Sequence, residues 1–188
     1  MRDPDQIRTY HGIDMDPFFP RTEEIDIRDI AHSLSLICRA NGHISHFYSV
    51  AQHCLNCEAE ASARGYDARI RAFCLLHDAT ECYISDLIRP IKRRFPEYYE
   101  AESRLFSMIC SKLIGDLPTE DEKQKISEID DALLYHEFLK LSGAKFFDEE
   151  PELKAELSFG FEAFEDVRKR YTAHYYELLT QIGGREDG

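Results

Sequence analysis

Apolar residues recur every three or four positions through most of the chain, which is the spacing of helices with one buried face. Asp26 is placed to cap the first of these segments, and we expect that helix to end near Asn41-Gly42. No sustained alternation of apolar and polar residues indicates a strand. The pattern predicts an all-α fold of about six or seven helices. The main helical segments are expected near residues 26–41, 49–63, 68–81, 97–114, 120–142 and 160–182.

The length of 188 residues fits one domain with a substantial core. Residues 1–24 contain several helix-breaking residues and aromatic side chains, so we expect an arm that packs on the body. Residues 25–182 are expected to form the helical body and 183–188 a flexible tail. The arm's aromatic residues are Tyr10, Phe18 and Phe19. In the last helix, aromatic residues at helical spacing predict core or interface packing.

One stretch concentrates ionisable groups at the end of an apolar run, where Leu75 and Leu76 lead into His77, Asp78 and, three residues on, Glu81. On a helix these three side chains would share one space, because Glu81 falls one turn after His77. Buried unpaired charge costs several kcal/mol, so a cation is a good candidate to balance it. A solvated helix turn is the alternative interpretation.

Further ligands are needed for a metal site, and a second imidazole should come from another helix. His53 follows two apolar residues and can face the core beside His77. His32 lies on the more polar side of its helix, whereas His43 and His46 lie on a loop that suits a substrate better than a rigid site.

A fourth ligand should be a carboxylate from the helix near 120–142. Asp130 lies one turn after Ile126 and one turn before Leu133, on the apolar stripe, while Asp131 lies nearer the polar flank. The helical phase favours Asp130, and Asp131 stays open as the alternative.

Composition narrows the classes of partner. The formal net charge of −13 argues against a nucleic-acid backbone or an anionic membrane as the main partner. No stretch approaches the length of a membrane-spanning helix, and the N-terminus lacks the apolar run of a secretory signal, so we expect a cytoplasmic protein. Cys54 and Cys57 form one CxxC without a second, so packing is favoured over a zinc knuckle or a redox role.

Several motifs together resemble HD-domain phosphohydrolases, specifically the bacterial 5′-deoxynucleotidase branch and its phage relatives. The similar segments are YSVAQH at 48–53, HDATE at 77–81, SDLIRPIK at 85–92 and the stretch 29–43, and the resemblance covers roughly residues 25–140. Gln52 departs from the pattern, because Glu is common before the first histidine. The resemblance implies an all-α HD-type helical fold and a metal site made of His53, His77, Asp78 and Asp130 or Asp131.

The resemblance also implies roles around the metal. Glu81 would orient or deprotonate the attacking water, and Asp86 would have a similar role; a turn cap is the alternative for Asp86. Arg39, beside the histidine-containing loop, could pair with phosphate through its planar fork. His46 and Lys92 are weaker candidates for phosphate binding, and a solvated surface role suits Lys92 equally well.

We therefore expect a metal-dependent hydrolase of (deoxy)nucleotide phosphate esters, with a 5′-deoxynucleotidase favoured over a deoxynucleoside triphosphate triphosphohydrolase. The metal is one divalent ion, with Co, Mn, Zn, Fe, Ni and Mg undistinguished. A nucleotide-sensing module without turnover is the alternative of another class. The partner is a small-molecule nucleotide, with no nucleic acid and no membrane; the resemblance and the aromatic last helix suggest a homo-oligomer.

Overall fold

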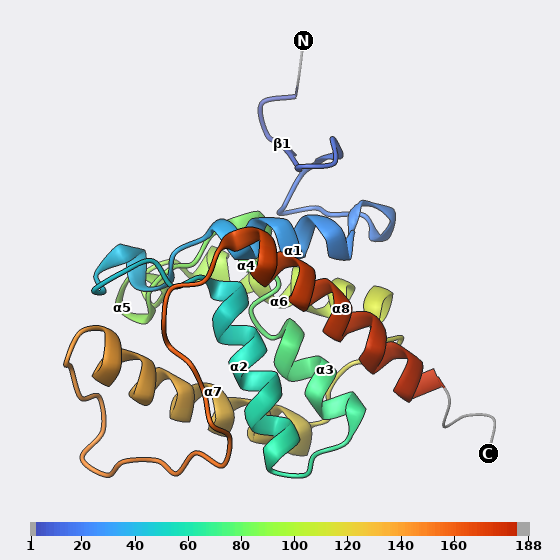
Figure 1. The fold of residues 1–188 in the computed structure, drawn as a ribbon. Coiled ribbons are helices and arrows are strands. Elements are labelled where there is room, and N and C mark those ends of the chain that lie inside the picture. Colours follow the sequence, from blue (N-terminus) through green and yellow to red (C-terminus); the bar gives the residue numbers. More distant parts are fainter. Residues whose placement is uncertain (1–2, 184–188) are drawn as a thin grey trace.

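Helices occupy most of residues 3–183, the part of the chain that the computed structural model describes (Figure 1). The all-α prediction is confirmed, with 60% of the chain in helices and 3% in strands in one compact domain. No helix within this range is long and apolar enough to cross a membrane. The helices are α1 (Ile27–Leu36), α2 (Val50–Ala63), α3 (Ala68–Leu76), α4 (Glu81–Ile84), α5 (Arg89–Lys92), α6 (Pro96–Leu113), α7 (Glu120–Leu141) and α8 (Phe164–Gly183), with short 3₁₀ turns η1 (Thr22–Glu24) and η2 (Arg39–Gly42).

The larger core lies where α1, α2, α3 and α8 meet, and α6 adds to it. Tyr171 and Tyr175 of α8 are buried there, and their hydroxyls donate to the carbonyls of Leu75 and Leu113. The helical aromatic spacing of α8 is therefore explained by core packing. A second cluster joins α2, α3 and α7 through residues such as Phe73, Ile129 and Leu133. Burial of these apolar faces against one another holds α2, α3 and α7 together, and these three helices carry the candidate site.

Side-chain caps define where the helices begin, as the sequence indicates. The carboxylate of Asp26 accepts from the Arg28 backbone N–H at 2.8 Å. Ser49 and Gln52 form a reciprocal capping box at the start of α2. A second capping box opens α7. Each cap satisfies backbone donors that the first helical turn leaves without partners.

The first helix ends at Leu36, five residues before the predicted stop at Asn41-Gly42. Ile37 adopts an extended conformation, and the backbone then pairs with residues 48–50 on the far side of the loop. Arg39 N–H donates to the Tyr48 carbonyl at 2.9 Å, and Val50 N–H donates to the Ile37 carbonyl at 3.0 Å. Arg39 therefore begins the short η2 turn and does not end a helix.

The third helix also ends earlier than predicted, at Leu76, so His77 and Asp78 lie just beyond it. Residues 77–80 form turns with hydrogen bonds that span three residues, such as Glu81 N–H to the Asp78 carbonyl at 3.0 Å. Glu81 then opens α4. The approach of Glu81 to Asp78 therefore comes from a tight turn and not from a continuous α-helix.

The N-terminal arm carries a two-stranded ladder, β1 (Ile7–Arg8) with β2 (Asp14–Met15), above α1 in Figure 1. Met15 is fully buried in the larger core, whereas Phe18 and Phe19 are exposed. Tyr10 stacks on His32 of α1 at 3.6 Å between ring centroids but stays mostly open to solvent. The arm thus packs on the body chiefly through Met15, and not through the phenylalanines we expected. Residues 1–2 and 184–188, the latter most of the predicted tail, lie outside the described residues.

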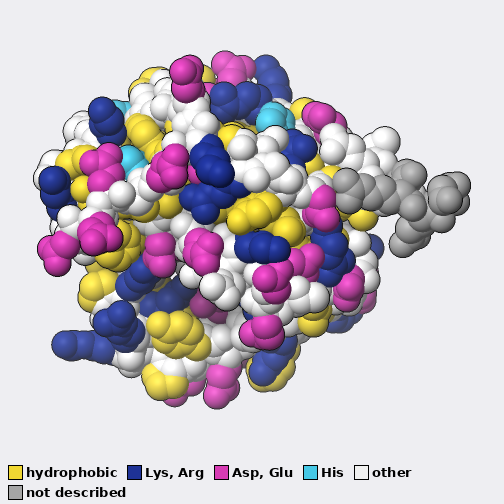
Figure 2. Space-filling view, turned by 90° about the horizontal axis from the view of Figure 1, so that it is seen from below, with side chains coloured by type: hydrophobic (Ala, Val, Ile, Leu, Met, Phe, Trp, Pro, Cys, Tyr) yellow, Lys and Arg dark blue, Asp and Glu magenta, His cyan; other side chains and the backbone are white. Residues whose placement is uncertain are grey.

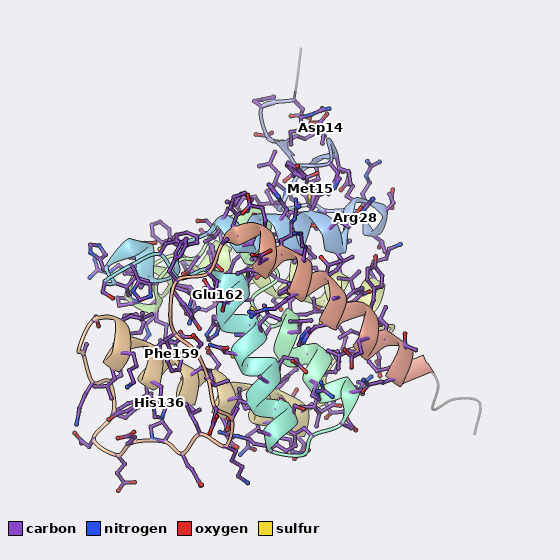
Figure 3. All side chains as sticks on the ribbon, in the orientation of Figure 1. Asp14, Met15, Arg28, His136, Phe159 and Glu162 are labelled. Carbon is purple, nitrogen blue, oxygen red and sulfur yellow. The ribbon has the colours of Figure 1, made fainter. Side chains whose placement is uncertain are left out.

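Residues 142–163, between α7 and α8, form no helix or strand and run back beside α2, which Figure 3 shows at Phe159 and Glu162. Within this segment, residues 151–160 alternate strictly between half-buried and exposed side chains, a period of two that the predicted elements did not include. Polar side chains of α2 bind its backbone in place of a partner strand. Gln52 donates to the Gly160 carbonyl, Asn56 donates to the Ser158 carbonyl, and Glu60 accepts from the N–H groups of 154 and 155. We call residues 142–163 the strap.

Candidate metal centre and its pocket

Two imidazoles and two carboxylates from three parts of the chain meet at one point. His53 comes from α2, His77 and Asp78 follow α3, and Asp130 comes from α7. His53 Nε2 lies 3.1 Å from His77 Nε2 and 3.1 Å from Asp130 Oδ1. Asp78 Oδ2 lies 3.3 Å from His77 Nε2 and 3.7 Å from His53 Nε2. Asp130, and not Asp131, faces the histidines, as the helical phase favoured.

The Nδ1 nitrogen of each imidazole already donates a hydrogen bond to a group outside the site. His53 Nδ1 lies 2.7 Å from Glu137 Oε1, and His77 Nδ1 lies 2.8 Å from the Cys74 carbonyl, an atom that can only accept. A neutral ring that donates from Nδ1 presents a lone pair at Nε2. The two Nε2 atoms lie against each other and against two carboxylate oxygens, so either protons on the rings or a cation between them must offset the contact. A bound cation could take the place of those protons, since imidazole and carboxylate are the ligand types that divalent transition metals take.

The two aspartates of the group, Asp78 and Asp130, both have lowered pKa values. Burial raises the pKa of Asp78, but His77 and Arg39 outweigh it and leave that pKa well below its usual range. Burial likewise opposes ionisation of Asp130, yet hydrogen bonds with His53 and His77 hold its pKa well below the usual range. Both side chains are thus held as carboxylates, the form that binds a metal.

Cysteines border the group. The ligand atoms of His53, Cys57 and His77 lie within 4.8 Å of one another, as do those of Cys54, His77 and Asp78. This buried His/Cys/Asp group could hold a metal ion. Burial raises the pKa of the Cys54 thiol, which favours its neutral form over the thiolate that a metal binds. All six cysteines are free.

Further side chains surround the two histidines and two aspartates and hold them in place. Arg39 donates to Asp78 Oδ2 at 3.2 Å and to Glu137 Oε2 at 3.3 Å. The Tyr48 hydroxyl donates to Glu137 Oε1 at 3.0 Å. Glu137 is fully buried and binds a histidine, an arginine and a tyrosine at once, so it orients His53. Its position seven residues after Asp130 on α7 was the sequence signal for its inward direction, but nothing in the sequence indicated this role.

The group opens into a pocket of about 500 Å³, within the usual range of small-molecule sites. Arg39, Asp78, Glu81, Asp86 and Lys92 all line it. The pocket therefore gathers anionic side chains, cationic side chains and side chains that could bind a metal in one space.

Two carboxyl groups in this pocket have raised pKa values. Burial raises the pKa of Glu81 well above its usual range, and Asp78 and Asp86 add to the shift. Glu81 Oε2 is buried without a hydrogen-bond partner among residues 3–183. Burial also raises the pKa of Asp86. Such groups are common at catalytic sites because they can take up or release a proton near neutral pH.

The backbone is strained beside these groups. Ala40 and Asn41 in η2 have positive φ angles of 54° and 51°, and Ser85, just before Asp86, has a φ of 71°. Residues other than glycine adopt this conformation at a cost, and such strain collects at functional sites where the surroundings enforce it. Here it turns the Ala40 backbone toward Asp86, whose carboxylate it hydrogen-bonds.

Comparison with known proteins identifies relatives but no described activity. No family model matches the chain. The uncharacterized protein YfdR of Escherichia coli K12 is 44% identical over 91 residues, a match that spans about half of each protein, 48% of this chain and 48% of YfdR. The uncharacterized protein RCAP_rcc00048 of Rhodobacter capsulatus is 31% identical over 192 aligned positions, 94% of this chain and 97% of that protein. This chain belongs to the same family as the Rhodobacter protein.

Two of the predicted substrate residues already have partners within the protein. His46 Nε2 lies 2.9 Å from the Phe159 carbonyl of the strap, and His46 does not line the pocket. Lys92 lines the pocket but forms an ion pair with Glu102 and lies 5.1 Å from the Tyr98 ring centroid. The structure thus brings Lys92, but not His46, to the candidate site.

Arg89 of α5 is a pocket residue that the sequence pattern did not single out. Its guanidinium lies 2.8 Å from Asp131 Oδ1 and 3.2 Å from Asp130 Oδ2. Because Asp130 meets the histidines through Oδ1, Arg89 can hold the other oxygen and fix the carboxylate's direction. Arg89 lies inside the SDLIRPIK segment, so the segment's position in the resemblance was the signal that could have found it.

Proposed function

We propose that this protein is a metal-dependent phosphohydrolase of the HD type that cleaves phosphate esters of nucleotides. A 5′-deoxynucleotidase acting on nucleoside monophosphates is the favoured activity. The observation that carries the proposal is the convergence of His53, His77, Asp78 and Asp130 beside a pocket that also contains Arg39 and Glu81. The motif resemblance supports the same assignment independently of these distances.

A divalent ion bound by these four residues would neutralise phosphate charge and lower the pKa of a water molecule. The chain's own contribution is to hold the four ligands ready. Glu137, Arg89 and the Cys74 carbonyl each fix one ligand from outside. Ligands held in this way need little rearrangement on binding.

Arg39 and Lys92 supply positive charge for the substrate's phosphate. The Arg39 guanidinium sits at the edge of the ligand group, with Asp78 and Glu137 as partners, and it lines the pocket. A planar guanidinium matches two phosphate oxygens at once, whereas the Lys92 ammonium acts as a point charge. Arg39 would therefore orient the phosphate and Lys92 would add attraction.

Glu81 and Asp86 are the carboxyl groups that act on the attacking water in the proposed reaction. Glu81 would accept the proton of the attacking water as its oxygen bonds to phosphorus. Glu81 would then return that proton to the departing ester oxygen as the P–O bond breaks, while Asp86, in the same pocket, would help to orient the water. A cation bound beside Asp78 would lower the pKa of Glu81, because positive charge favours its carboxylate form.

A triphosphohydrolase would use the same residues but release triphosphate, and a sensing module would bind nucleotide without turnover. A panel of nucleoside mono- and triphosphates, incubated separately with Co²⁺, Mn²⁺, Zn²⁺, Fe²⁺, Ni²⁺ and Mg²⁺, distinguishes the three by product. We expect metal-dependent release of inorganic phosphate from monophosphates. Asp78→Asn should abolish it and Asp131→Asn should retain it. Nucleotide binding without any product, under every metal, would refute the enzyme proposal.

A further inference from the structure

One wall of the pocket is apolar and faces the charged residues. It consists of Leu134, Phe138, Phe146 and Phe147, which we call the aromatic wall. Phe138 and Phe146 meet edge to face at 4.7 Å between centroids, and Phe147 lies 6.2 Å from Tyr135 in a stacked arrangement. Phe146 and Phe147 are nevertheless 51% and 40% exposed. Two large apolar rings therefore line a pocket without being part of the core.

The segment that carries Phe146 and Phe147 is hydrogen-bonded to the rest of the protein at both of its ends, and the residues between these two points are exposed. The Leu141 carbonyl accepts from Ser45 N–H at 2.8 Å, and the Pro151 carbonyl lies 2.7 Å from His136 Nε2. All of residues 142–150 between these ties are exposed. Core packing therefore does not account for Phe146 and Phe147, since their neighbours on the strap face solvent too.

Helix α7 relates this wall to the metal-ligating group. Asp130, Leu134 and Phe138 follow one another at intervals of four residues and line the same pocket. Residues at that interval share one face, and each interval adds about 6 Å of rise. The wall thus begins one turn from the ligand group and reaches its aromatic part after two turns. A ligand with a phosphate at one end and a flat ring at the other would match both.

We propose that the aromatic wall binds the base of the nucleotide substrate by stacking, while Arg39 and the metal group bind its phosphate. This rests on the proposed function for the phosphate end. Every base has a π-face, and in proteins that bind single-stranded nucleic acid the bases stack on aromatic side chains. Covering Phe146 and Phe147 with a base would also remove exposed apolar surface from water.

Calorimetric titration with deoxyadenosine, which lacks phosphate, tests the wall separately from catalysis. We expect wild-type protein to bind this nucleoside and the variant Phe146→Ala/Phe147→Ala to bind it about 5- to 150-fold more weakly, the range for lost base stacking. Phe161→Ala is the matched control, because Phe161 is an exposed phenylalanine of the same strap outside the pocket. It should bind as wild type does.

Kinetics complete the test. In the double variant, kcat/KM for deoxyadenosine monophosphate should fall by a similar factor, while kcat/KM for glycerol phosphate, which has no ring, should stay unchanged. Equal nucleoside binding by wild type and double variant, or an equal fall for both phosphate esters, would overturn the proposal. If no ester is cleaved but nucleoside binding still depends on the two rings, the wall stands and the phosphohydrolase proposal fails.

Discussion

At the scale of single residues, Glu81 is the clearest candidate for a role in binding or proton transfer, because its buried Oε2 has no hydrogen-bond partner among residues 3–183. A carboxylate left this way costs stability, so a role in binding or proton transfer is the natural reason for its presence. It contacts neither histidine at hydrogen-bonding distance, which separates it from Asp78 and Asp130. We therefore expect Glu81 to act beside a bound metal and not as one of its ligands.

Glu81→Gln should keep the shape of the pocket and the metal content but lower kcat by about 10²–10⁴, the usual range for loss of a general base. Steady-state kinetics on metal-saturated protein measure this, with elemental analysis of the same sample. Wild-type turnover would rule out the catalytic role, and loss of metal would make Glu81 a ligand. Glu97→Gln, on the exposed first turn of α6, controls for the change of charge.

At the scale of elements, the strap shows how an extended segment can be held without a sheet. Gln52, Asn56 and Glu60 lie four residues apart on α2 and bind the strap's backbone in turn. Glu60 is fully buried, accepts from the Lys154 and Ala155 N–H groups, and also binds Arg64 at 2.8 Å. The same helix presents His53 and Cys57 toward the candidate metal site, so it contacts the strap and that site through different faces.

Replacing Glu60 by Ala should open the strap locally, because the two backbone donors lose a charged acceptor worth about 1.5–3 kcal/mol. Cleavage within residues 142–163 by a dilute protease should then become about 10- to 150-fold faster when opening precedes cleavage. Mass spectrometry of the fragments measures the rate and the sites. Glu152→Ala, whose exposed side chain lies on the strap itself, is the control. Equal cleavage of both variants would contradict this role of Glu60.

The sequence predicts some of these elements and not others, for physical reasons that differ. Local signals define helix starts, because Asp26, Ser49 and Thr119 each bind backbone donors within their own first turn. The early end of α1 depends on pairing between Cys38 and Ser49, eleven residues apart, which no local pattern reveals. The strap's alternation was present in the sequence at 151–160. It leads to no strand, because the backbone there binds side chains of α2 and not a neighbouring strand.

At the candidate site, the spacing of apolar residues predicted that His53 and Asp130 face the core, because residues three or four positions apart share one face of a helix. It did not give Glu137 or Arg89 as partners of the ligands, since these contacts join residues 84 and 41 positions apart. His46 was expected at the substrate, but in the structure its Nε2 lies 2.9 Å from the Phe159 carbonyl of the strap, a contact that joins residues 113 positions apart.

At the scale of the whole molecule, three helices are joined by one buried carboxylate away from the pocket. Glu58 of α2 binds Arg71 of α3 at 2.8 Å and His174 of α8 at 3.0 Å. Burial raises the pKa of Glu58, but hydrogen bonds with His174 and Arg71 outweigh it and leave that pKa below its usual value. A lowered folded-state pKa adds stability that is present above the unfolded-state pKa of about 4.3 and is lost as pH falls through the folded value.

Glu58→Gln should therefore lower the free energy of unfolding by about 1.5–3 kcal/mol near neutral pH. The difference from wild type should shrink as pH falls below about 4.3, where the wild-type carboxylate also loses its charge. Urea unfolding at several pH values measures both curves. Glu165→Gln, exposed at the start of α8, should follow wild type throughout. A constant difference across the acid range would contradict the linkage.

The surface offers little direct guidance on partners, since acidic and basic side chains lie intermingled on the face shown in Figure 2. The expected homo-oligomer and cytoplasmic location both stay predictions. In α8, burial of Tyr171 and Tyr175 in the chain's own core removes one of the two reasons for expecting an interface. The candidate metal site joins residues of α2 and α7 with residues that follow α3, so metal binding there should raise the stability of the whole fold.

A metal that binds only the folded chain stabilises it by mass action, by about 2.7 kcal/mol at a free concentration one hundred times Kd. For a chain of this size, 1 kcal/mol shifts Tm by about 2–4 °C, so saturating metal should raise Tm by roughly 5–11 °C. Differential scanning fluorimetry with each divalent ion, and with excess chelator as reversal, measures the shift and identifies the preferred ion. Asp130→Asn should lose most of the shift because its Oδ1 meets both histidines, at 3.1 and 3.8 Å. Asp131→Asn should retain it, since Asp131 contacts Arg89 and neither imidazole. The same shift in both variants would place the metal elsewhere, and no shift with any ion in wild-type protein would refute the metal centre itself.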